Sequence, residues 1–269
     1  MAKAYADHSG ARLRPSPNHN ERRGNGGPDL LILHYTAMAD GERAVRWLCN
    51  PESEVSAHYM VHKDGSVEQM VPESRRAWHA GLSEWGAGIG AGRDVNSRSI
   101  GIEIDNTGVM YRGENAPDDA PILTPVDYCD AQIESLIQLC NGICQRHQIE
   151  PRYVLGHSDV APNRKQDPGE HFPWERLAQA GIGHWVEPEA IGSGQFFGPG
   201  DAGPPVEALK QMLLLYGYVL EPHGPIDETT SAALMAFQRH FRPARVDGIA
   251  DRSTIATLHR LLSRLPKLT

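Results

Sequence analysis

Short apolar runs separated by polar segments dominate the first two thirds of the chain, and this pattern predicts β-strands. Five such runs are strand candidates: residues 30–33, 57–62, 67–71, 99–105 and 153–155. Asp64-Gly65 joins the second run to the third and predicts a β-hairpin. Apolar and polar residues alternate in the fourth run, so Glu103 and Asp105 should share one face of that strand.

Helical signals lie between some of these runs. Asp40 is a suitable N-cap for a short helix, in which we expect Trp47 to turn inward. Thr124-Pro125 has the form of an N-cap followed by proline at the first helical position. It predicts a longer helix that ends near His147.

The last third of the chain has a different pattern. Residues 187–203 are rich in Gly and Pro and have little to bury, which predicts a linker. Beyond it, over residues 204–269, three apolar stripes at helical spacing predict a small three-helix bundle. The stripes are Val206, Leu209, Leu213 and Tyr216, then Leu234, Phe237, Gln238 and Phe241, then Ile255, Leu258, Leu261 and Leu262. We expect this bundle to fold on its own. Residues 1–27 are polar and predict an irregular arm, which leaves residues 28–186 as the main domain.

The composition narrows the class of partner and the compartment. Of the 269 residues 40% are hydrophobic, which suffices for a packed core, and the net charge of −8 argues against nucleic acid and anionic membrane surfaces as partners. No apolar stretch has the length of a membrane span, and the first residues lack the apolar core of a secretory signal. The four cysteines form no C-x-x-C pair and are expected to be reduced thiols. We therefore predict a cytoplasmic protein, with a periplasmic or exported location as the alternative.

Two histidines occupy the same place relative to predicted strands. His34 closes the first apolar run, and His157 follows the last one. A single histidine at such a place is more often a core or surface residue, but two of them with a nearby carboxylate match an open zinc site. The loop after His157 contains Asp167, and Pro168 and Gly169 restrict its backbone. No cysteine lies near these residues, which argues against a closed structural zinc site.

Two further features have more than one interpretation. Glu103 and Asp105 lie either on a solvated edge of the sheet or on the wall of a catalytic cleft. Ser158 lies beside His157 in sequence, but adjacent residues do not face each other, and no G-x-S-x-G turn is present. A serine hydrolase is therefore not supported.

Five motifs occur in an order that resembles a known enzyme family. They are Leu33-His34-Tyr35-Thr36, Ser56-Ala57-His58-Tyr59, Trp78-His79-Ala80-Gly81, Ser99-Ile100-Gly101-Ile102-Glu103, and Gly156-His157-Ser158-Asp159 through Lys165-Gln166-Asp167-Pro168-Gly169. Together they are similar to the zinc-dependent N-acetylmuramoyl-L-alanine amidases, the amidase-2 group, over residues 28–180. The last part of the chain, with Gly217-Tyr218, Phe237-Gln238 and Val246-Asp247-Gly248, resembles the three-helix peptidoglycan-binding domain, which implies that it binds glycan.

The resemblance implies a fold and a set of site residues. The fold is mixed α/β, with a central mixed β-sheet flanked by helices. Carried over by position, His34, His157 and Asp167 are the ligands of one zinc ion, and Glu103 and Lys165 are the catalytic residues. The two other motif histidines supply no metal ligand in the family: we expect His58 to be structural and His79 to be either structural or part of the cleft lining.

The implied reaction is hydrolysis of the amide between the lactyl group of N-acetylmuramic acid and L-alanine, in peptidoglycan or muropeptides. Zinc would lower the pKa of the attacking water, Glu103 would take its proton and return it to the leaving amine, and Lys165 would stabilise the oxyanion. The alternatives are a recognition protein that binds muropeptides without cutting them, and a zinc amidase that cuts a stem-peptide bond. The intact set of five site residues favours the enzyme. The bundle favours a polymeric substrate, whereas the missing secretory signal favours soluble fragments.

Overall fold

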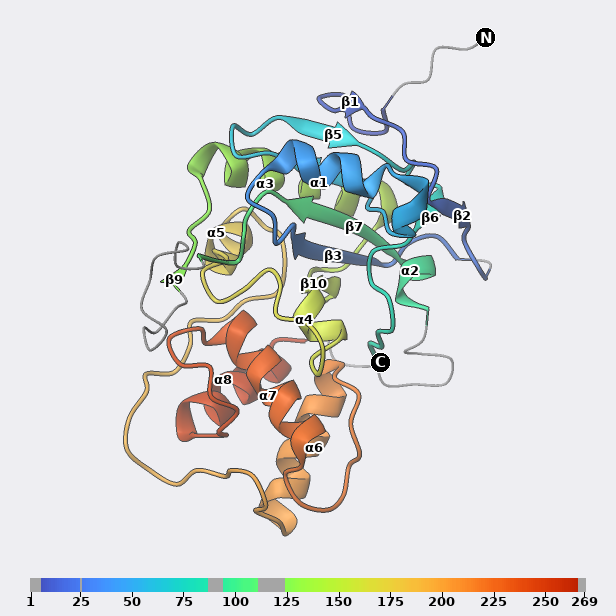
Figure 1. Cartoon of the computed structure of the whole chain (residues 1–269). Helices are drawn as coiled ribbons and strands as arrows, with labels where there is room; N and C mark the ends of the chain where they lie inside the picture. Colours follow the sequence, from blue (N-terminus) through green and yellow to red (C-terminus); the bar gives the residue numbers. More distant parts are fainter. Residues whose placement is uncertain (1–5, 25, 87–93, 111–123, 266–269) are drawn as a thin grey trace, which may run out of the picture.

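A six-stranded mixed sheet forms the centre of the main domain (Figure 1). The computed structural model describes residues 6–24, 26–86, 94–110 and 124–265. Across the sheet the strands are β1 (Arg12–Leu13), β5 (Val67–Gln69), β4 (Tyr59–Val61), β7 (Ser99–Ile104), β3 (Leu30–Tyr35) and β10 (Val154–Gly156). All neighbours are parallel except β4 and β5, which form the predicted hairpin around Asp64-Gly65. The mixed sheet confirms the expected fold class.

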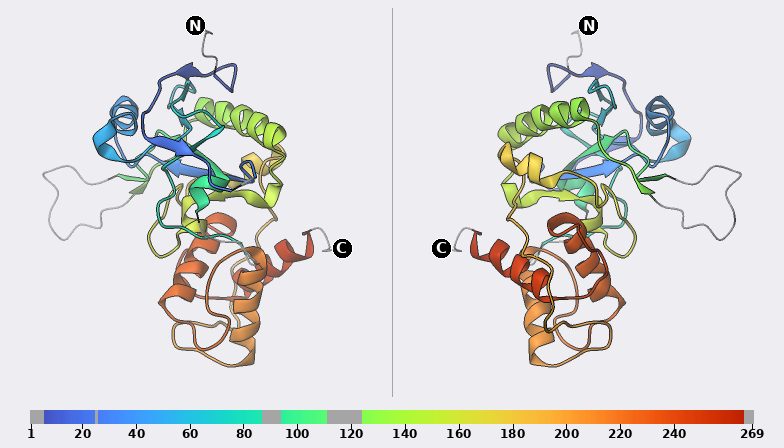
Figure 2. Two further views of the ribbon diagram at one scale, coloured as in Figure 1. Left: turned by 90° about the vertical axis from the view of Figure 1, so that its right-hand side faces the viewer. Right: turned by 90° about the vertical axis from the view of Figure 1, so that its left-hand side faces the viewer.

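Helices cover both faces of this sheet, as the two side views show (Figure 2). The helices α3 (Asp130–His147) and α5 (Trp174–Gln179) pack on one face, whereas α1 (Gly41–Leu48) packs on the other. Alternation along β3 sends Leu31 and Leu33 toward α3, and Leu30 and Ile32 to the opposite face. His34 continues this second set, so it points to the face that carries α1.

The predicted start of the long helix was wrong. It begins at Asp130 with Cys129 as the N-cap, whereas the strand β9 (Thr124–Pro125) pairs with β8 (Val109–Met110). Strand pairing with a distant segment therefore overrides a local cap signal at Thr124-Pro125. The cap predicted at Asp40 is confirmed, since its side chain accepts a hydrogen bond from the backbone N–H of Glu42 at 3.0 Å.

The described residues 6–24 of the predicted N-terminal arm are more regular than predicted. Besides β1 they contain β2 (His19–Glu21), which pairs antiparallel with β6 (Arg75–Ala77). The hydroxyl of Ser16 donates to the carbonyl of Leu48 at 2.6 Å, and Asn18 is buried. This segment is part of the main domain because its backbone groups pair with the sheet and its polar side chains tie it to the end of α1.

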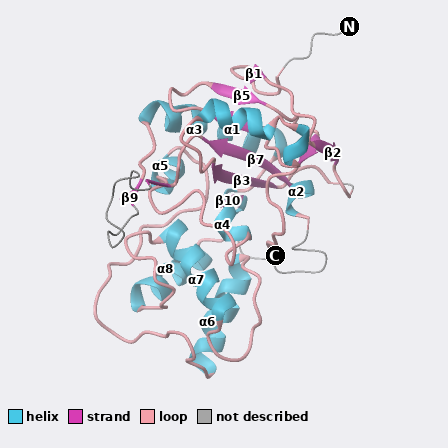
Figure 3. Ribbon diagram, viewed as in Figure 1, coloured by secondary structure: helices cyan, strands magenta, loops and turns pink. Residues whose placement is uncertain are grey.

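The C-terminal region is the predicted three-helix bundle (Figure 3). Its helices are α6 (Pro204–Tyr216), α7 (Glu228–Phe241) and α8 (Arg252–Ser263). The side chain of Gln238 accepts hydrogen bonds from the backbone N–H groups of Asp247 and Gly248 and donates to the carbonyl of Ile249. One buried amide thus fixes the turn that leads into α8. No helix among the described residues is long and apolar enough to span a membrane.

The bundle and the main domain share a continuous apolar core. Trp85, Leu155 and Val160 belong to the same buried cluster as Tyr216, Tyr218 and Phe237. The backbone of Gly217 lies against the Trp85 ring, where a Cβ atom would come within 2.5 Å, and its φ is +141°. Glycine is therefore required at this contact. Independent folding of the bundle stays a prediction, and it has to be weighed against this buried contact.

The short helix α4 (His157–Val160) carries the polar part of the same contact. Asp159 accepts hydrogen bonds from the hydroxyl of Tyr218 and from Nδ1 of His240, each at 2.7 Å. The predicted linker is also held in place: Glu189 bonds through its backbone to Ser253 and Thr257 of α8. The bundle is thus fixed to the segment that begins with His157.

Candidate metal centre and active site

The proposed site lies where β3, β7 and β10 end. His34 on β3 and Glu103 on β7 are paired in register, and both point to the face that carries α1. His157 follows β10 directly and begins α4. Because the carboxyl ends of these parallel strands meet at one edge of the sheet, residues far apart in sequence come together there.

Asp167 comes to the same place on a loop that folds back along α4. The carbonyl of Asp167 accepts a hydrogen bond from the backbone N–H of Ser158 at 2.9 Å, and a cis peptide bond joins Asp167 to Pro168. The ring of Pro168 lies against Gly156, where a Cβ atom would come within 2.7 Å. The glycine before His157 therefore makes room for the loop that carries Asp167.

Three potential metal ligands converge at this point. Nδ1 of His34 lies 2.9 Å from Nδ1 of His157, and each of these nitrogens lies 3.0 Å from Oδ2 of Asp167. All three side chains are buried. Two imidazole nitrogens and one carboxylate oxygen, brought this close together in a buried site, are the donor set of a catalytic zinc site with one position left for water. The residues present therefore fit a zinc ion.

The charge states of these groups suit metal binding. Burial, together with the neighbouring His157, lowers the pKa of His34 to about 4, so its ring is neutral at pH 7. Burial alone would raise the pKa of Asp167, but His157 and His34 outweigh it and hold that pKa well below its usual range. A neutral imidazole and an ionised carboxylate are the forms that bind zinc.

Glu103 and Lys165 lie beside these ligands in a cleft of about 260 Å³. Burial raises the pKa of Glu103 well above its ordinary value, the Asp167 charge adds to this effect, and the Lys165 charge opposes it. Oε2 of Glu103 is buried and has no hydrogen-bond partner among the described residues. A carboxylate without a fixed partner and with a raised pKa is suited to exchange a proton with a bound molecule.

Trp47 is exposed, contrary to the prediction that it turns inward. It is 48% exposed because α1 buries Ala44, Val45 and Leu48 instead. Its indole lines the cleft that contains Glu103, and so does Trp78. Aromatic walls beside a polar centre are a common feature of small-molecule sites.

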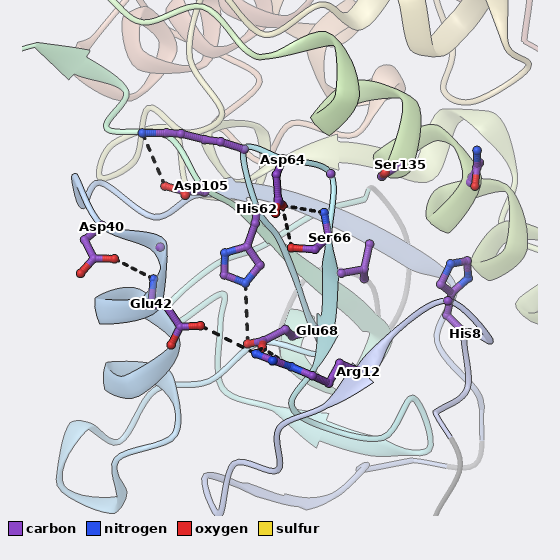
Figure 4. A pocket seen from close by; sticks show the side chains of 16 residues that line it. His8, Arg12, Asp40, Glu42, His62, Asp64, Ser66, Glu68, Asp105 and Ser135 are labelled. Carbon is purple, nitrogen blue, oxygen red and sulfur yellow. Dashed lines mark hydrogen bonds and ion pairs between the residues drawn. The ribbon is translucent and has the colours of Figure 1, made fainter.

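Asp105, predicted to share a face with Glu103, lines a different pocket (Figure 4). Glu42, His62 and Glu68 also line that pocket, and ligand atoms of these three side chains lie within 4.8 Å of one another. Oε2 of Glu68 is buried without a hydrogen-bond partner among the described residues. This second cluster is separate from the cleft of Glu103.

His79 makes a contact that the sequence did not reveal. Its Nδ1 lies 2.9 Å from Nε2 of His34, and its ring packs on Gly101, where a Cβ atom would come within 2.4 Å. The spacing of Ser99, Gly101 and Glu103 on one face of β7 is the sequence signal that could have indicated this contact. His58, in contrast, is structural as expected: its Nδ1 accepts from the backbone N–H of Gly101, and burial lowers its pKa to about 3.

Comparison with known families and proteins gives a consistent result. Residues 24–170 match the family described as N-acetylmuramoyl-L-alanine amidase, and residues 202–258 match the putative peptidoglycan binding domain. The chain is 38% identical over 245 residues to the N-acetylmuramoyl-L-alanine amidase AmiD of Escherichia coli, covering 87% of this chain and 82% of that protein. It is 32% identical over 185 residues to the 1,6-anhydro-N-acetylmuramyl-L-alanine amidase AmpD of Citrobacter freundii, a match to 62% of this chain and 88% of that protein.

Two solved structures extend the similarity over nearly the whole chain. One is the E. coli AmiD complex with anhydro-N-acetylmuramic acid-L-Ala-D-gamma-Glu-L-Lys, at 35% identity and a TM-score of 0.71, covering 91% of this chain and 92% of that one. The other is AmpDH3 of Pseudomonas aeruginosa in complex with anhydromuramic pentapeptide, at 32% identity and a TM-score of 0.70, covering 99% and 98%. Both domains of this chain are included in these matches.

Proposed function

Since the chain belongs to the N-acetylmuramoyl-L-alanine amidase family and so hydrolyses the amide between N-acetylmuramic acid and L-alanine, we propose that it uses one zinc ion bound to His34, His157 and Asp167. The observation that carries this proposal is the convergence of two Nδ1 atoms and one carboxylate oxygen at 2.9 to 3.0 Å in a buried site. Bound zinc supplies a water of lowered pKa and polarises the scissile carbonyl.

The two neighbouring residues have complementary roles in the reaction. Glu103 accepts a proton from the attacking water as the oxygen of that water bonds to the carbonyl carbon. The ammonium group of Lys165 stabilises the negative charge that develops on the carbonyl oxygen. Glu103 then gives its proton to the nitrogen of L-alanine as the C–N bond breaks. The raised pKa of Glu103 supports both of its steps, because a carboxyl of ordinary pKa is a weak base.

The substrate is a peptidoglycan-derived muropeptide, since solved relatives hold anhydromuramyl peptides. The match of residues 202–258 to a peptidoglycan-binding domain supports a further role in holding the polymer beside the cleft. We propose that the chain cuts intact peptidoglycan as well as soluble fragments. The cytoplasmic location expected from the sequence remains a prediction.

Mass spectrometry of the products tests the reaction directly. Incubation with a soluble anhydro-muropeptide and with purified sacculi should release peptides with a free L-alanine amino group. Products cut within the stem peptide, or binding without any product, would contradict the proposal. Glu103→Ala is the matched control: it should keep zinc and fold, and lose turnover by about 100-fold or more, the size typical of general acid–base catalysis.

A further inference from the structure

The segment Trp78–Gly81 contacts both histidine ligands on the side away from the other ligand atoms. The side chain of His79 reaches Nε2 of His34 at 2.9 Å, and the backbone carbonyl of Ala80 reaches Nε2 of His157 at 3.0 Å. Each ligand imidazole therefore has one nitrogen in the metal cluster and the other on this segment. These contacts determine which nitrogen of each ring carries the proton.

The proton on His157 follows from its partner. A carbonyl oxygen can only accept a hydrogen bond, so Nε2 of His157 carries the proton and donates it to Ala80. In a neutral ring this leaves the lone pair on Nδ1, the atom that faces His34 and Asp167. The backbone of Ala80 thus prepares His157 as an Nδ1 ligand.

The proton on His34 follows from a chain of hydrogen bonds. Oγ of Ser99 lies 2.6 Å from the carbonyl oxygen of Val95, a contact that requires the hydroxyl proton to point at Val95. Nε2 of His79, at 3.0 Å from the same Oγ, must then donate to it. Neutral His79 therefore accepts through Nδ1, so Nε2 of His34 donates and Nδ1 of His34 keeps its lone pair.

The segment is itself fixed in place. Oδ1 of Asn96, a buried residue, accepts hydrogen bonds from the backbone N–H groups of His79 and Ala80, at 3.1 and 2.8 Å. The His79 ring lies on Gly101, where any side chain would displace it. Asn96 and Gly101 therefore hold the imidazole and the carbonyl of the segment at the two Nε2 atoms.

We propose that His79 is a positioning residue for the zinc site: it accepts from His34, as Ala80 accepts from His157, and so holds the His34 ring in the tautomer that leaves Nδ1 free for the metal. This inference rests on the proposed zinc site. Without the acceptor at residue 79, the His34 proton can move to Nδ1 and bond to Asp167, which blocks the ligand atom. Partners of this kind commonly account for about 10- to 100-fold in metal affinity.

Zinc affinity, measured by competition with a chromophoric chelator, tests the proposal independently of catalysis. His79→Leu removes the acceptor at similar size and should weaken zinc binding about 10- to 100-fold. His79→Asn keeps an acceptor oxygen at the place of Nδ1 and should restore most of that affinity. His184→Leu is the matched control: this half-buried histidine bonds to the hydroxyl of Tyr216 and to no proposed ligand, so its loss should leave zinc affinity unchanged.

Long-range ¹H–¹⁵N NMR of the histidine rings provides a second readout, the tautomer of each ring. A purely structural role of His79 would leave the His34 tautomer unchanged. The wild-type protein should show His34 and His157 protonated at Nε2, and His79→Leu should shift the His34 proton toward Nδ1. Should the Leu variant fail to fold, Ser99→Ala keeps the His79 ring and removes only the hydroxyl that accepts from its Nε2. This variant should also weaken zinc binding.

The outcomes separate the two proposals. A wild-type protein that binds no zinc overturns the proposed function. Wild-type zinc binding with unchanged affinity and tautomers in the folded His79 and Ser99 variants overturns the role of His79 alone. Weaker binding in His79→Leu, rescued in His79→Asn, supports it.

Discussion

The cluster of His34, His157 and Asp167 and the cluster of Glu42, His62 and Glu68 offer similar ligand atoms, in each case within 4.8 Å of one another. Their surroundings differ. In the first cluster the carboxylate oxygen Oδ2 meets two imidazoles and, among the described residues, no guanidinium. In the second, Arg12 approaches both carboxylates (Figure 4), and Arg14 approaches them as well.

These arginines already balance the charge of the second cluster. Nε of Arg12 donates to Oε1 of Glu68 at 2.9 Å, and Arg14 bonds to Glu42 at 3.2 Å. A divalent cation placed there would have to displace or repel two fixed positive charges. Proximity of ligand atoms is thus not sufficient for a metal site; the neighbouring groups must also leave the negative charge and the lone pairs uncompensated.

Removing the carboxylate of the first cluster should have the largest effect. Asp167→Ala deletes one of three proposed ligands and the only anionic one, so the protein should lose most of its zinc and with it nearly all turnover, while staying folded. Zinc is measured by elemental analysis after desalting, and folding by circular dichroism. A full complement of zinc in this variant would contradict the ligand assignment.

Lys165→Ala tests a positive charge that serves the reaction rather than the metal. Turnover of a muropeptide should fall by about 10²- to 10³-fold, the size expected when one oxyanion partner is lost, while zinc content stays at one per chain. Steady-state kinetics on the zinc-loaded protein measure this. Near-normal turnover with bound zinc would exclude the catalytic role, and loss of zinc would indicate a role in holding the metal site.

Glu73 is a buried carboxylate whose negative charge is balanced by neighbouring side chains, as in the second cluster. Burial opposes ionisation, but hydrogen bonds from His147, Arg146 and Tyr59 outweigh it and lower the pKa of Glu73 to about 2. This stabilisation is present above the ordinary carboxyl pKa near 4.5 and is lost as the pH falls from there toward 2. Glu73→Gln should lower the free energy of unfolding by about 1.5 to 3 kcal/mol at pH 7.

Urea unfolding over a series of pH values measures this effect. Below pH 4.5 the stability of the wild-type protein should decline more steeply than that of Glu73→Gln, because only the wild-type protein must protonate this carboxylate. Parallel curves for the two proteins would show that Glu73 does not determine the loss of stability at acid pH.

The smallest effect is expected in the second cluster. Glu68→Ala removes its most buried carboxylate, and zinc content and zinc affinity should not change. The same elemental analysis and chelator competition apply. A drop from two zinc ions per chain to one would show that Arg12 and Arg14 do not prevent metal binding there.

The roles of Glu103 and Lys165 came from the family resemblance, whereas the parts of the site that the residue pattern itself predicted are those with a local signal. A polar residue directly after a buried apolar run places His34 and His157 at strand ends, whatever packs around them. The three-helix bundle could be predicted for the same reason, since its apolar stripes repeat at helical spacing. The cap at Asp40 and the hairpin at Asp64-Gly65 likewise depend on neighbours a few residues away.

The features that the sequence did not reveal depend on distant partners. Thr124-Pro125 has the signal of a helix start, but it pairs with β8 and the helix begins later. Trp47 is apolar and was placed in the core, yet the buried stripe of α1 leaves it at the cleft. His79 reaches His34 only because β7 presents a glycine beneath its ring, a relation that requires the register of the sheet.

The hydrogen bonds of Asp159 have a consequence for the exchange of modules between proteins of this architecture. Its carboxylate bonds to the backbone of Gly156, next to a proposed zinc ligand, and to Tyr218 and His240 across the domain contact. A graft that replaced the bundle at the Gly- and Pro-rich linker would leave this buried carboxylate without two of its donors. A compatible replacement therefore has to bring its own hydroxyl and imidazole to Asp159. The Gly- and Pro-rich linker is thus not a boundary at which the main domain and the bundle can be exchanged freely.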